Sequence, residues 1–153
     1  DLKVIISYLS KRYTNIEFIP HVTLLSGFLG KPEDLIRKSK NLARRMSPFD
    51  LRLGNIAFSN EFFRSFFINV ETDKDFINAR KLAIKEFSYQ DLGFLPHLSL
   101  AYGIYDESII RKMKLFTFDK LGNSKGFYVD SIYLANNNEV DMNWEIIEKF
   151  TLI

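Results

Sequence analysis

The chain has 153 residues, of which 46% are hydrophobic, 15% aromatic and 26% charged, and this balance excludes a disordered tail or a low-complexity scaffold. It contains no cysteine, which excludes disulfides, thiolate metal sites and cysteine nucleophiles and fits a reducing, cytoplasmic location. A net charge of +2 is too balanced for a protein that binds duplex DNA by phosphate neutralisation, and no apolar run is long enough to enter a membrane as a spanning helix.

The sequence predicts a mixture of helices and strands. Apolar residues at three- and four-residue spacing predict helices, and short apolar runs predict strands. Pro32 suits the first turn of a helix, Thr72 or Asp73 can cap the next one, and Asn136–Asn138 predict a turn. In chain order the expected elements are a helix over 2–13, a strand over 18–25, a helix over 32–46, strands over 49–58 and 62–70, a helix through 76–87, a strand over 98–102, a helix over 106–113, and strands over 115–118, 127–134 and 145–152.

The chain contains an internal repeat but no Pro-, Gly- or Ser-rich linker, so we expect one domain over 1–153 with two related lobes. The stretch Phe18–Gly27 matches Phe94–Gly103 without a gap. Both histidines of the protein, His21 and His97, lie at the same position of this repeat, after Pro and two residues before Thr or Ser. Random placement would give this coincidence a chance of roughly one in 10^5. Packing does not explain such a doubling, so the histidines are candidate catalytic residues.

The spacing of the repeat predicts which side chains act together. Residues two apart on a strand face the same side, so His21 projects with Thr23, and His97 projects with Ser99. One imidazole can take a proton near neutral pH while the other gives one. Hydroxyls can donate hydrogen bonds to anionic oxygens. If the two strands lie side by side, these four groups suit the hydrolysis of a phosphodiester.

Metal and cofactor sites are not expected. Zinc sites usually recruit three or four protein ligands, whereas this sequence has no cysteine, no third histidine and no carboxylate next to either motif. The glycine patterns of serine hydrolases, Walker loops and dinucleotide-binding folds are also missing from the sequence.

The motifs Pro-His-Val-Thr-Leu and Pro-His-Leu-Ser-Leu-x-Tyr-Gly resemble those of the 2H phosphoesterase superfamily, and look most like its cyclic phosphodiesterase branch. The stretch Trp144–Phe150 resembles the closing strand of that branch. The resemblance implies a bilobed α+β fold, with two antiparallel β-sheets, helices outside, and pseudo-two-fold symmetry around a central cleft that holds both motifs. A strand with a Trp-Leu pair usually precedes the first helix in this family. Its absence predicts that the natural chain begins upstream of Asp1.

The resemblance also implies an activity, which is metal-independent hydrolysis of a nucleoside 2′,3′-cyclic phosphate or of ADP-ribose 1″,2″-cyclic phosphate to a phosphomonoester. His21 and His97 would be the acid/base pair, in an order that the symmetric motifs do not reveal. Thr23 and Ser99 would hold the phosphate. Tyr102 would contact the substrate, although strict alternation puts it opposite His97, so a bulge or a strand end is needed there.

Two other functions remain open at this point. One is a 2H phosphodiesterase acting on 2′,5′-linked oligonucleotides or RNA ends, and the other is a non-catalytic module that binds RNA or a nucleotide. We expect a monomer without a membrane or duplex DNA partner. Arg64, a charged residue within a predicted apolar strand, is a further candidate for the site. Phe28 and Phe94 flank the motifs and are expected to pack in the core.

Overall fold

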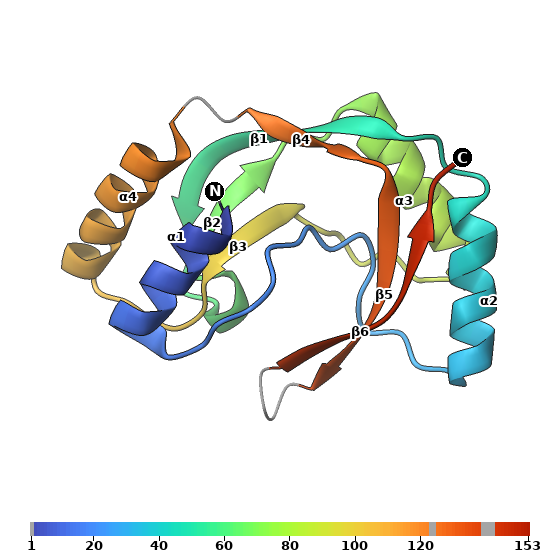
Figure 1. Cartoon of the computed structure of the whole chain (residues 1–153), viewed down its shortest axis with the longest axis horizontal. Helices are drawn as coiled ribbons and strands as arrows, with labels where there is room; N and C mark the ends of the chain where they lie inside the picture. Colours follow the sequence, from blue (N-terminus) through green and yellow to red (C-terminus); the bar gives the residue numbers. More distant parts are fainter. Residues whose placement is uncertain (1, 123–124, 139–142) are drawn as a thin grey trace. The chain divides into compact units, whose positions relative to one another are not determined.

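A computed structural model describes residues 2–122, 125–138 and 143–153, which form two units (Figure 1). The first unit comprises residues 1–22, 53–70 and 96–125, and the second comprises residues 23–52, 71–95 and 126–153. Each unit is therefore assembled from three separate stretches of chain. The division does not follow the two halves that the internal repeat suggested, because each copy of the repeat crosses from one unit to the other.

The first unit is built on antiparallel strands. The strand β1 (Phe49–Phe58) contributes residues 53–58, which pair with β2 (Phe66–Val70), and β2 pairs in turn with β3 (His97–Ala101). The register places Ile68 opposite both Ile56 and Leu98. Because β2 pairs with β1 on one edge and with β3 on the other, it is the central strand of this part of the sheet.

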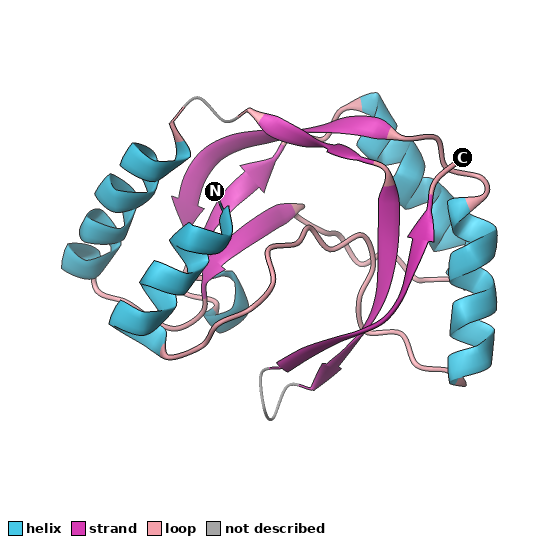
Figure 2. Ribbon diagram, in the orientation of Figure 1, coloured by secondary structure: helices cyan, strands magenta, loops and turns pink. Residues whose placement is uncertain are grey.

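Two helices complete the first unit. The helix α1 (Leu2–Leu9) continues into a π-helical segment, Ser10–Thr14, and contacts both β3 and α4 (Glu107–Leu121), as Figure 2 shows. The core combines apolar residues from α1, the strands and α4. Its members include Ile5, Ile6, Leu9, Phe66, Ile68, Leu98, Leu100 and Met113, each no more than 1% exposed.

The second unit has two helices and a long antiparallel ribbon. The ribbon pairs β5 (Ser131–Asn138) with β6 (Asn143–Thr151), and α2 (Pro32–Ala43) packs against it and against α3 (Lys74–Phe87). Its buried apolar cluster contains Leu42, Ala43, Met46, Ala79, Ala83, Leu134, Phe150 and Leu152.

The first part of β1 also belongs to the second unit. There, Phe49 lies opposite Val129 and Arg52 lies opposite Gly126, the first residue of β4 (Gly126–Val129). A Cβ atom at Gly126 would lie 1.9 Å from the carbonyl oxygen of Leu51, and the residue has a φ of 152°. Only glycine fits so close an approach of the two strands.

Several helix boundaries follow the signals in the sequence. Pro32 occupies the first turn of α2 as predicted, followed by two acidic residues. The carboxylate of Asp73 accepts hydrogen bonds from the amides of Asp75 and Phe76 at 3.1 and 3.0 Å, and thereby caps α3. The carboxylate of Asp106 likewise accepts from the amide of Ile109, at 2.9 Å. The predicted α+β class with antiparallel strands is confirmed.

Two predicted strands are wrong. Residues 18–25 form no strand, and within them only Val22 makes a bridge, to Leu98. Residues 115–118 lie inside α4, whose helical spacing continues through the buried residues Met113 and Thr117. Leu115 and Phe118 face solvent on that helix, at 71% and 76% exposure. Exposed apolar residues add to the buried ones along this part of the helix, and the resulting short apolar run has the sequence pattern of a strand. This explains the wrong prediction.

Three smaller predictions also need correction. The predicted strand over 127–134 is divided at Asp130 into β4 and β5. Asn136–Asn138 form the end of β5 rather than a turn, because they pair with Asn143–Glu145 of β6. Finally, Phe62–Arg64 form a 3-10 turn before β2 rather than its first residues.

Candidate active site

The first motif lies beside the strand that carries the second motif. Val22 forms an antiparallel bridge with Leu98, and both residues belong to the first unit. In an antiparallel pair, the residue before Val22 lies at the level of the residue after Leu98, so His21 is level with Ser99. The first motif does not form the predicted strand, but it does lie next to the second motif, as predicted.

His21 has a defined tautomer. Its Nδ1 lies 2.7 Å from the carbonyl oxygen of Ile19. A carbonyl oxygen can only accept, so Nδ1 carries the proton and, in the neutral ring, Nε2 carries the lone pair. The edge of the ring faces Phe18, with centroids 6.4 Å apart. This geometry presents Nε2 as the basic atom of the ring.

The surroundings of His21 favour its neutral form. Burial lowers the pKa of His21 most, the charge of His97 lowers it further, and the hydrogen bond to Ile19 acts in the opposite direction. The net effect is a pKa below the usual value of 6.5. The contribution of His97 also means that its imidazole lies close enough for its charge to act on His21.

His97 begins β3, opposite Asn69 of β2. Its half-buried ring meets the ring of Phe67 edge to face, with centroids 5.4 Å apart and an interplanar angle of 68°. The strand fixes the backbone of His97, and the phenylalanine supports one side of its imidazole.

Ser99 is held by a turn that precedes β2. Its hydroxyl, 5% exposed as a residue, donates to the carbonyl oxygen of Phe63 at 3.1 Å. The hydroxyl of Ser65, two residues further on, donates to the carbonyl oxygen of Ala101 at 2.8 Å. These two bonds attach the chain to β3 at Phe63 and at Ser65. Because a serine hydroxyl has one proton, Ser99 must release Phe63 to donate to another acceptor.

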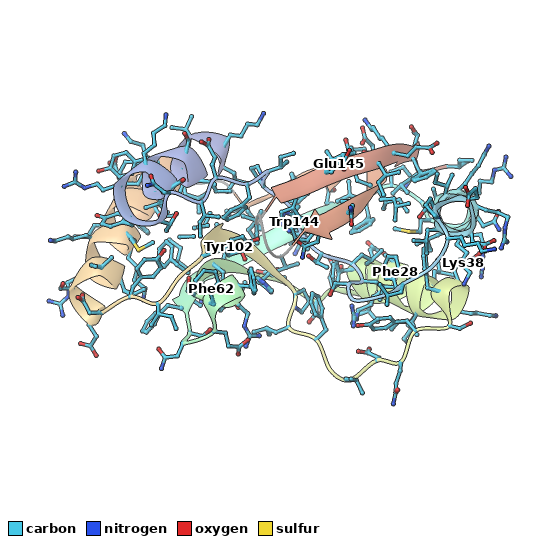
Figure 3. The ribbon with its side chains drawn as sticks, turned by 90° about the horizontal axis from the view of Figure 1, so that it is seen from below. Phe28, Lys38, Phe62, Tyr102, Trp144 and Glu145 are labelled. Atoms are coloured by element: carbon cyan, nitrogen blue, oxygen red, sulfur yellow. The ribbon has the colours of Figure 1, made fainter. Side chains whose placement is uncertain are left out.

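Tyr102 belongs to an aromatic cluster that borders both motifs. It follows the last residue of β3, is 4% exposed, and stacks on Phe18 with centroids 4.1 Å apart. Its ring also meets the ring of Phe63 at 5.5 Å. The pairing of β2 with β3 shifts register just before Ala101, so the bulge and the strand end required by strict alternation are both present. Figure 3 labels Tyr102 together with Phe62, the residue before Phe63. Contact of Tyr102 with substrate stays a prediction.

Thr23 is the first residue of the second unit and is half-buried. The carbonyl oxygen of the next residue, Leu24, accepts a hydrogen bond from Nη1 of Arg80 at 2.5 Å. The backbone beside the threonine is therefore fixed by a side chain from α3.

A family model described as the 2′-5′ RNA ligase superfamily matches residues 2–141. The chain belongs to this superfamily, that of the 2H phosphoesterases. The resemblance found in the two His-x-Thr/Ser motifs is thereby confirmed at the level of the superfamily. The cyclic phosphodiesterase branch and the roles of individual residues stay predictions.

Solved structures share the fold of this 2H phosphoesterase. LigT of E. coli, crystallised in complex with 3′-AMP, superposes with a TM-score of 0.60 at 13% identity, over 99% of this chain and 91% of LigT. TT0787 of Thermus thermophilus superposes with a TM-score of 0.58 at 16% identity, also over 99% of this chain and 91% of its own. A search of curated proteins found no match.

Two further expectations concern metals and membranes. Within the described ranges of this 2H phosphoesterase, no three histidine or carboxylate side chains gather closely enough to hold a metal ion. None of its helices, as far as the chain is described, is long and apolar enough to cross a membrane.

Arg64 lies in the 3-10 turn and not in the strand where it was predicted. It forms an ion pair with Glu61, and its guanidinium lies 5.9 Å from the ring centroid of Phe67, the phenylalanine that supports His97. Phe28 packs beside Phe87 in the second unit, as expected for a core residue.

Sequence reasoning missed the groups that hold the motif residues in place. They are the backbone carbonyls of Ile19 and Phe63 and the side chain of Arg80. Carbonyl oxygens occur at every position, so no sequence pattern marks the two that matter. Arg80 follows the buried residue Ala79 on a helix. A charged side chain next to a buried position is the one sequence signal that could have indicated the role of Arg80.

Proposed function

We propose that this 2H phosphoesterase hydrolyses a cyclic phosphodiester to a phosphomonoester without a metal ion. The substrate is a nucleoside 2′,3′-cyclic phosphate or ADP-ribose 1″,2″-cyclic phosphate. The observation that carries the proposal is the pair His21 and His97, which lie on adjacent segments, close enough for the charge of His97 to contribute to lowering the pKa of His21. Binding alone does not need two such groups. Hydrolysis does, because one group takes a proton from the attacking water and the other gives a proton to the leaving oxygen.

His21 is the general base of the proposed reaction. Its pKa is lowered, its Nδ1 proton is committed to Ile19, and its Nε2 is therefore the atom that takes a proton. The attacking water loses a proton to Nε2 as its oxygen forms a bond to phosphorus. His97 is then the acid, and it gives a proton to the ribose oxygen as the bond from that oxygen to phosphorus breaks. Proton exchange with solvent restores both rings.

Thr23 and Ser99 bind the non-bridging phosphate oxygens in this mechanism. Negative charge on these oxygens grows as water attacks, so hydrogen bonds to them stabilise the transition state more than the substrate. Ser99 donates to Phe63 in the present structure. On substrate binding its hydroxyl rotates toward the phosphate, which is the stronger acceptor because it is charged. Tyr102 contacts the substrate from the aromatic cluster.

The kind of substrate is supported by the comparison with LigT, which was crystallised with 3′-AMP. A ribonucleoside monophosphate is also the kind of product that opening a 2′,3′-cyclic phosphate yields. The same proposal includes a single domain with pseudo-two-fold symmetry and a central cleft that holds both motifs. It also includes a monomeric protein located in the cytoplasm.

A second candidate function is favoured by the description of the matching family model, which names 2′-5′ RNA ligases. In that case the substrate is a 2′,5′-linked oligonucleotide or an RNA end, and the same two histidines act on a linear phosphodiester.

One experiment separates these functions. The purified protein is incubated with 2′,3′-cyclic nucleotides, ADP-ribose 1″,2″-cyclic phosphate and 2′,5′-linked dinucleotides, and products are resolved by phosphorus NMR. We expect cyclic phosphates to be opened and the linear dinucleotides to stay intact. Turnover of the dinucleotides alone would establish the second candidate. Nucleotide binding without turnover of any substrate would indicate a binding module and contradict the proposal.

A further inference from the structure

Arg80 connects the two stretches of the second unit that adjoin the motifs. Its side chain is 12% exposed and extends from α3. Nη1 donates to the carbonyl oxygen of Leu24 at 2.5 Å, and Nη2 donates to the carboxylate of Asp91 at 2.9 Å. The guanidinium also lies 4.4 Å from the ring centroid of Phe94. One side chain thus holds a residue just after the first motif and two residues just before the second.

Neither of these stretches has regular structure to fix it. Residues 23–31 and residues 89–96 contain no helix or strand. The amide of Gly93 donates to the same carboxylate oxygen of Asp91, at 3.2 Å, so Asp91 also fixes its own loop. Further along the first stretch, Phe28 packs against Phe87, whose ring also lies 5.7 Å from Nζ of Lys38; Figure 3 labels Phe28 and Lys38. Residues 23–31 are therefore held at Leu24 by Arg80 and at Phe28 by an aromatic contact.

The interactions of Arg80 are directed at the backbone and the loop of its own unit. Each of its terminal nitrogens donates to a protein acceptor, and its guanidinium lies over the ring of Phe94. The side-chain hydrogen bond with Arg80 is also the main reason that the pKa of Asp91 is lowered. These contacts suit a role in holding the chain.

We infer that Arg80 is a positioning residue that orients Thr23 for phosphate binding by holding the carbonyl of Leu24. The Leu24 carbonyl lies one residue after Thr23, so holding it anchors the chain directly beside the threonine and limits the backbone conformations that Thr23 can adopt. The planar fork of arginine can hold Leu24 and Asp91 together, whereas a lysine ammonium has no such fixed geometry. The inference rests on the proposed phosphate-binding role of Thr23.

The test compares Arg80→Ala and Arg80→Lys with Arg45→Ala. Arg45 pairs with Glu86 of α3 at 3.2 Å in the same unit and provides a matched control, because no contact of Arg45 with a motif segment is described. Hydrolysis of a 2′,3′-cyclic nucleotide is measured well below each variant's unfolding midpoint. We expect both Arg80 variants to lose about tenfold in kcat/KM, and Arg45→Ala to equal the wild type. Wild-type kcat/KM in Arg80→Ala would overturn the inference.

A double-mutant cycle with Thr23→Ala separates positioning from stability. If Arg80 acts through Thr23, adding Arg80→Ala to Thr23→Ala costs little more activity, whereas adding it to Ser99→Ala costs the full factor. A merely structural role would make both losses additive, and that result would contradict the inference.

Backbone NMR makes the inference independent of turnover. In Arg80→Ala, we expect the amide signals of residues 23–25 and 91–94 to shift and to exchange faster with solvent, while Arg45→Ala leaves them unchanged. Unchanged signals in Arg80→Ala would overturn the inference even in an active enzyme. If the wild-type protein hydrolyses no substrate, the proposed function fails, and the NMR comparison still decides whether Arg80 holds the Thr23 segment.

Discussion

The two copies of the repeat share five of their ten residues and have different structures. The second copy forms β3, hydrogen-bonded along its length to β2, with Leu98 and Leu100 at 1% and 0% exposure. The first copy has Val22 and Leu24 at the corresponding positions, yet both are only half-buried and a single bridge is formed. Full burial of a leucine side chain contributes roughly 1.5–3 kcal/mol, so the second copy is fixed by its core and the first is not.

This difference teaches how each histidine is held. His97 takes its position from a strand, while His21 takes its position from the hydrogen bond to Ile19 and from the bridge at Val22. Equal motifs therefore do not imply equal roles. The carbonyl of Ile19 sets the tautomer of His21, and the sheet fixes the backbone of His97. These two environments are consistent with the proposed roles of His21 as base and His97 as acid.

The largest predicted effect tests whether both copies are needed. His21→Ala and His97→Ala should each lower kcat on cyclic phosphates by about 10^2–10^4, because each removes one proton transfer. The double variant should lose little more than either single one, since the two groups act as a unit. Steady-state kinetics on folded protein, verified by circular dichroism, measures this. A single variant with near-wild-type turnover on every cyclic phosphate would disprove the paired mechanism.

The next effect sharpens the comparison at the hydroxyls. Thr23→Ala and Ser99→Ala should each lower kcat/KM by about 10- to 150-fold, because one hydrogen bond to a charged phosphate contributes roughly 1.5–3 kcal/mol. Only Ser99→Ala should also lower the free energy of unfolding, by about 1–3 kcal/mol, since it leaves the carbonyl of Phe63 without its donor. Chemical denaturation of both variants measures the difference. Equal stability of the two would show that the Phe63 bond contributes nothing.

A smaller effect concerns pH. The pKa of His21 is lowered in the folded protein, so between that value and 6.5 the unfolded chain binds more protons than the folded one. The free energy of unfolding should therefore fall as pH drops below 6.5, and stop falling once the folded protein is also protonated at His21. Urea denaturation between pH 5 and 8 should show a weaker decline in His21→Gln than in the wild type. Identical slopes would contradict the lowered pKa.

The same pKa shapes the kinetics. The profile of kcat/KM against pH should be bell-shaped, with an acid limb below pH 6.5 as His21 becomes protonated and an alkaline limb as the general acid loses its proton. His21→Gln should remove the acid limb from the residual activity. A flat profile from pH 5 to 9 would rule out two titrating groups.

The smallest predicted effect is none at all. The proposed reaction uses imidazole protons and hydroxyl groups, so hydrolysis should continue at the same rate in excess EDTA. The control is the same assay after addition of single divalent ions. Activity that disappears with chelator and returns with one ion would disprove the metal-independent mechanism.

Sequence reasoning predicted the superfamily better than the local structure. The repeat singled out His21, Thr23, His97 and Ser99, whose types and spacing carry the resemblance to the superfamily, and their roles stay predictions. The strand predicted over 18–25 was wrong because strand formation needs a partner, and only Val22 has one. The same limit explains Asn136–Asn138, whose turn-forming residues are kept extended by pairing with β6.

The superfamily was identifiable from ten residues in each copy, whereas the contacts that hold those residues were not. Ile19, Phe63 and Leu24 act through backbone carbonyls, whose role depends on tertiary position. The role of Tyr102 stays a prediction: strict alternation required a bulge or a strand end there, and both a register shift and the end of β3 occur just before it.

The assembly of each unit from three separate stretches has a consequence for how the protein forms during synthesis. Helix α1 is synthesised before its partner β3, which is complete only once Ala101 has been translated, and the second unit lacks its ribbon until β6 has been made. No single cut releases either unit as a continuous polypeptide. Contacts between distant parts of a chain slow folding, so we expect neither unit to fold stably during synthesis before its last stretch has been made.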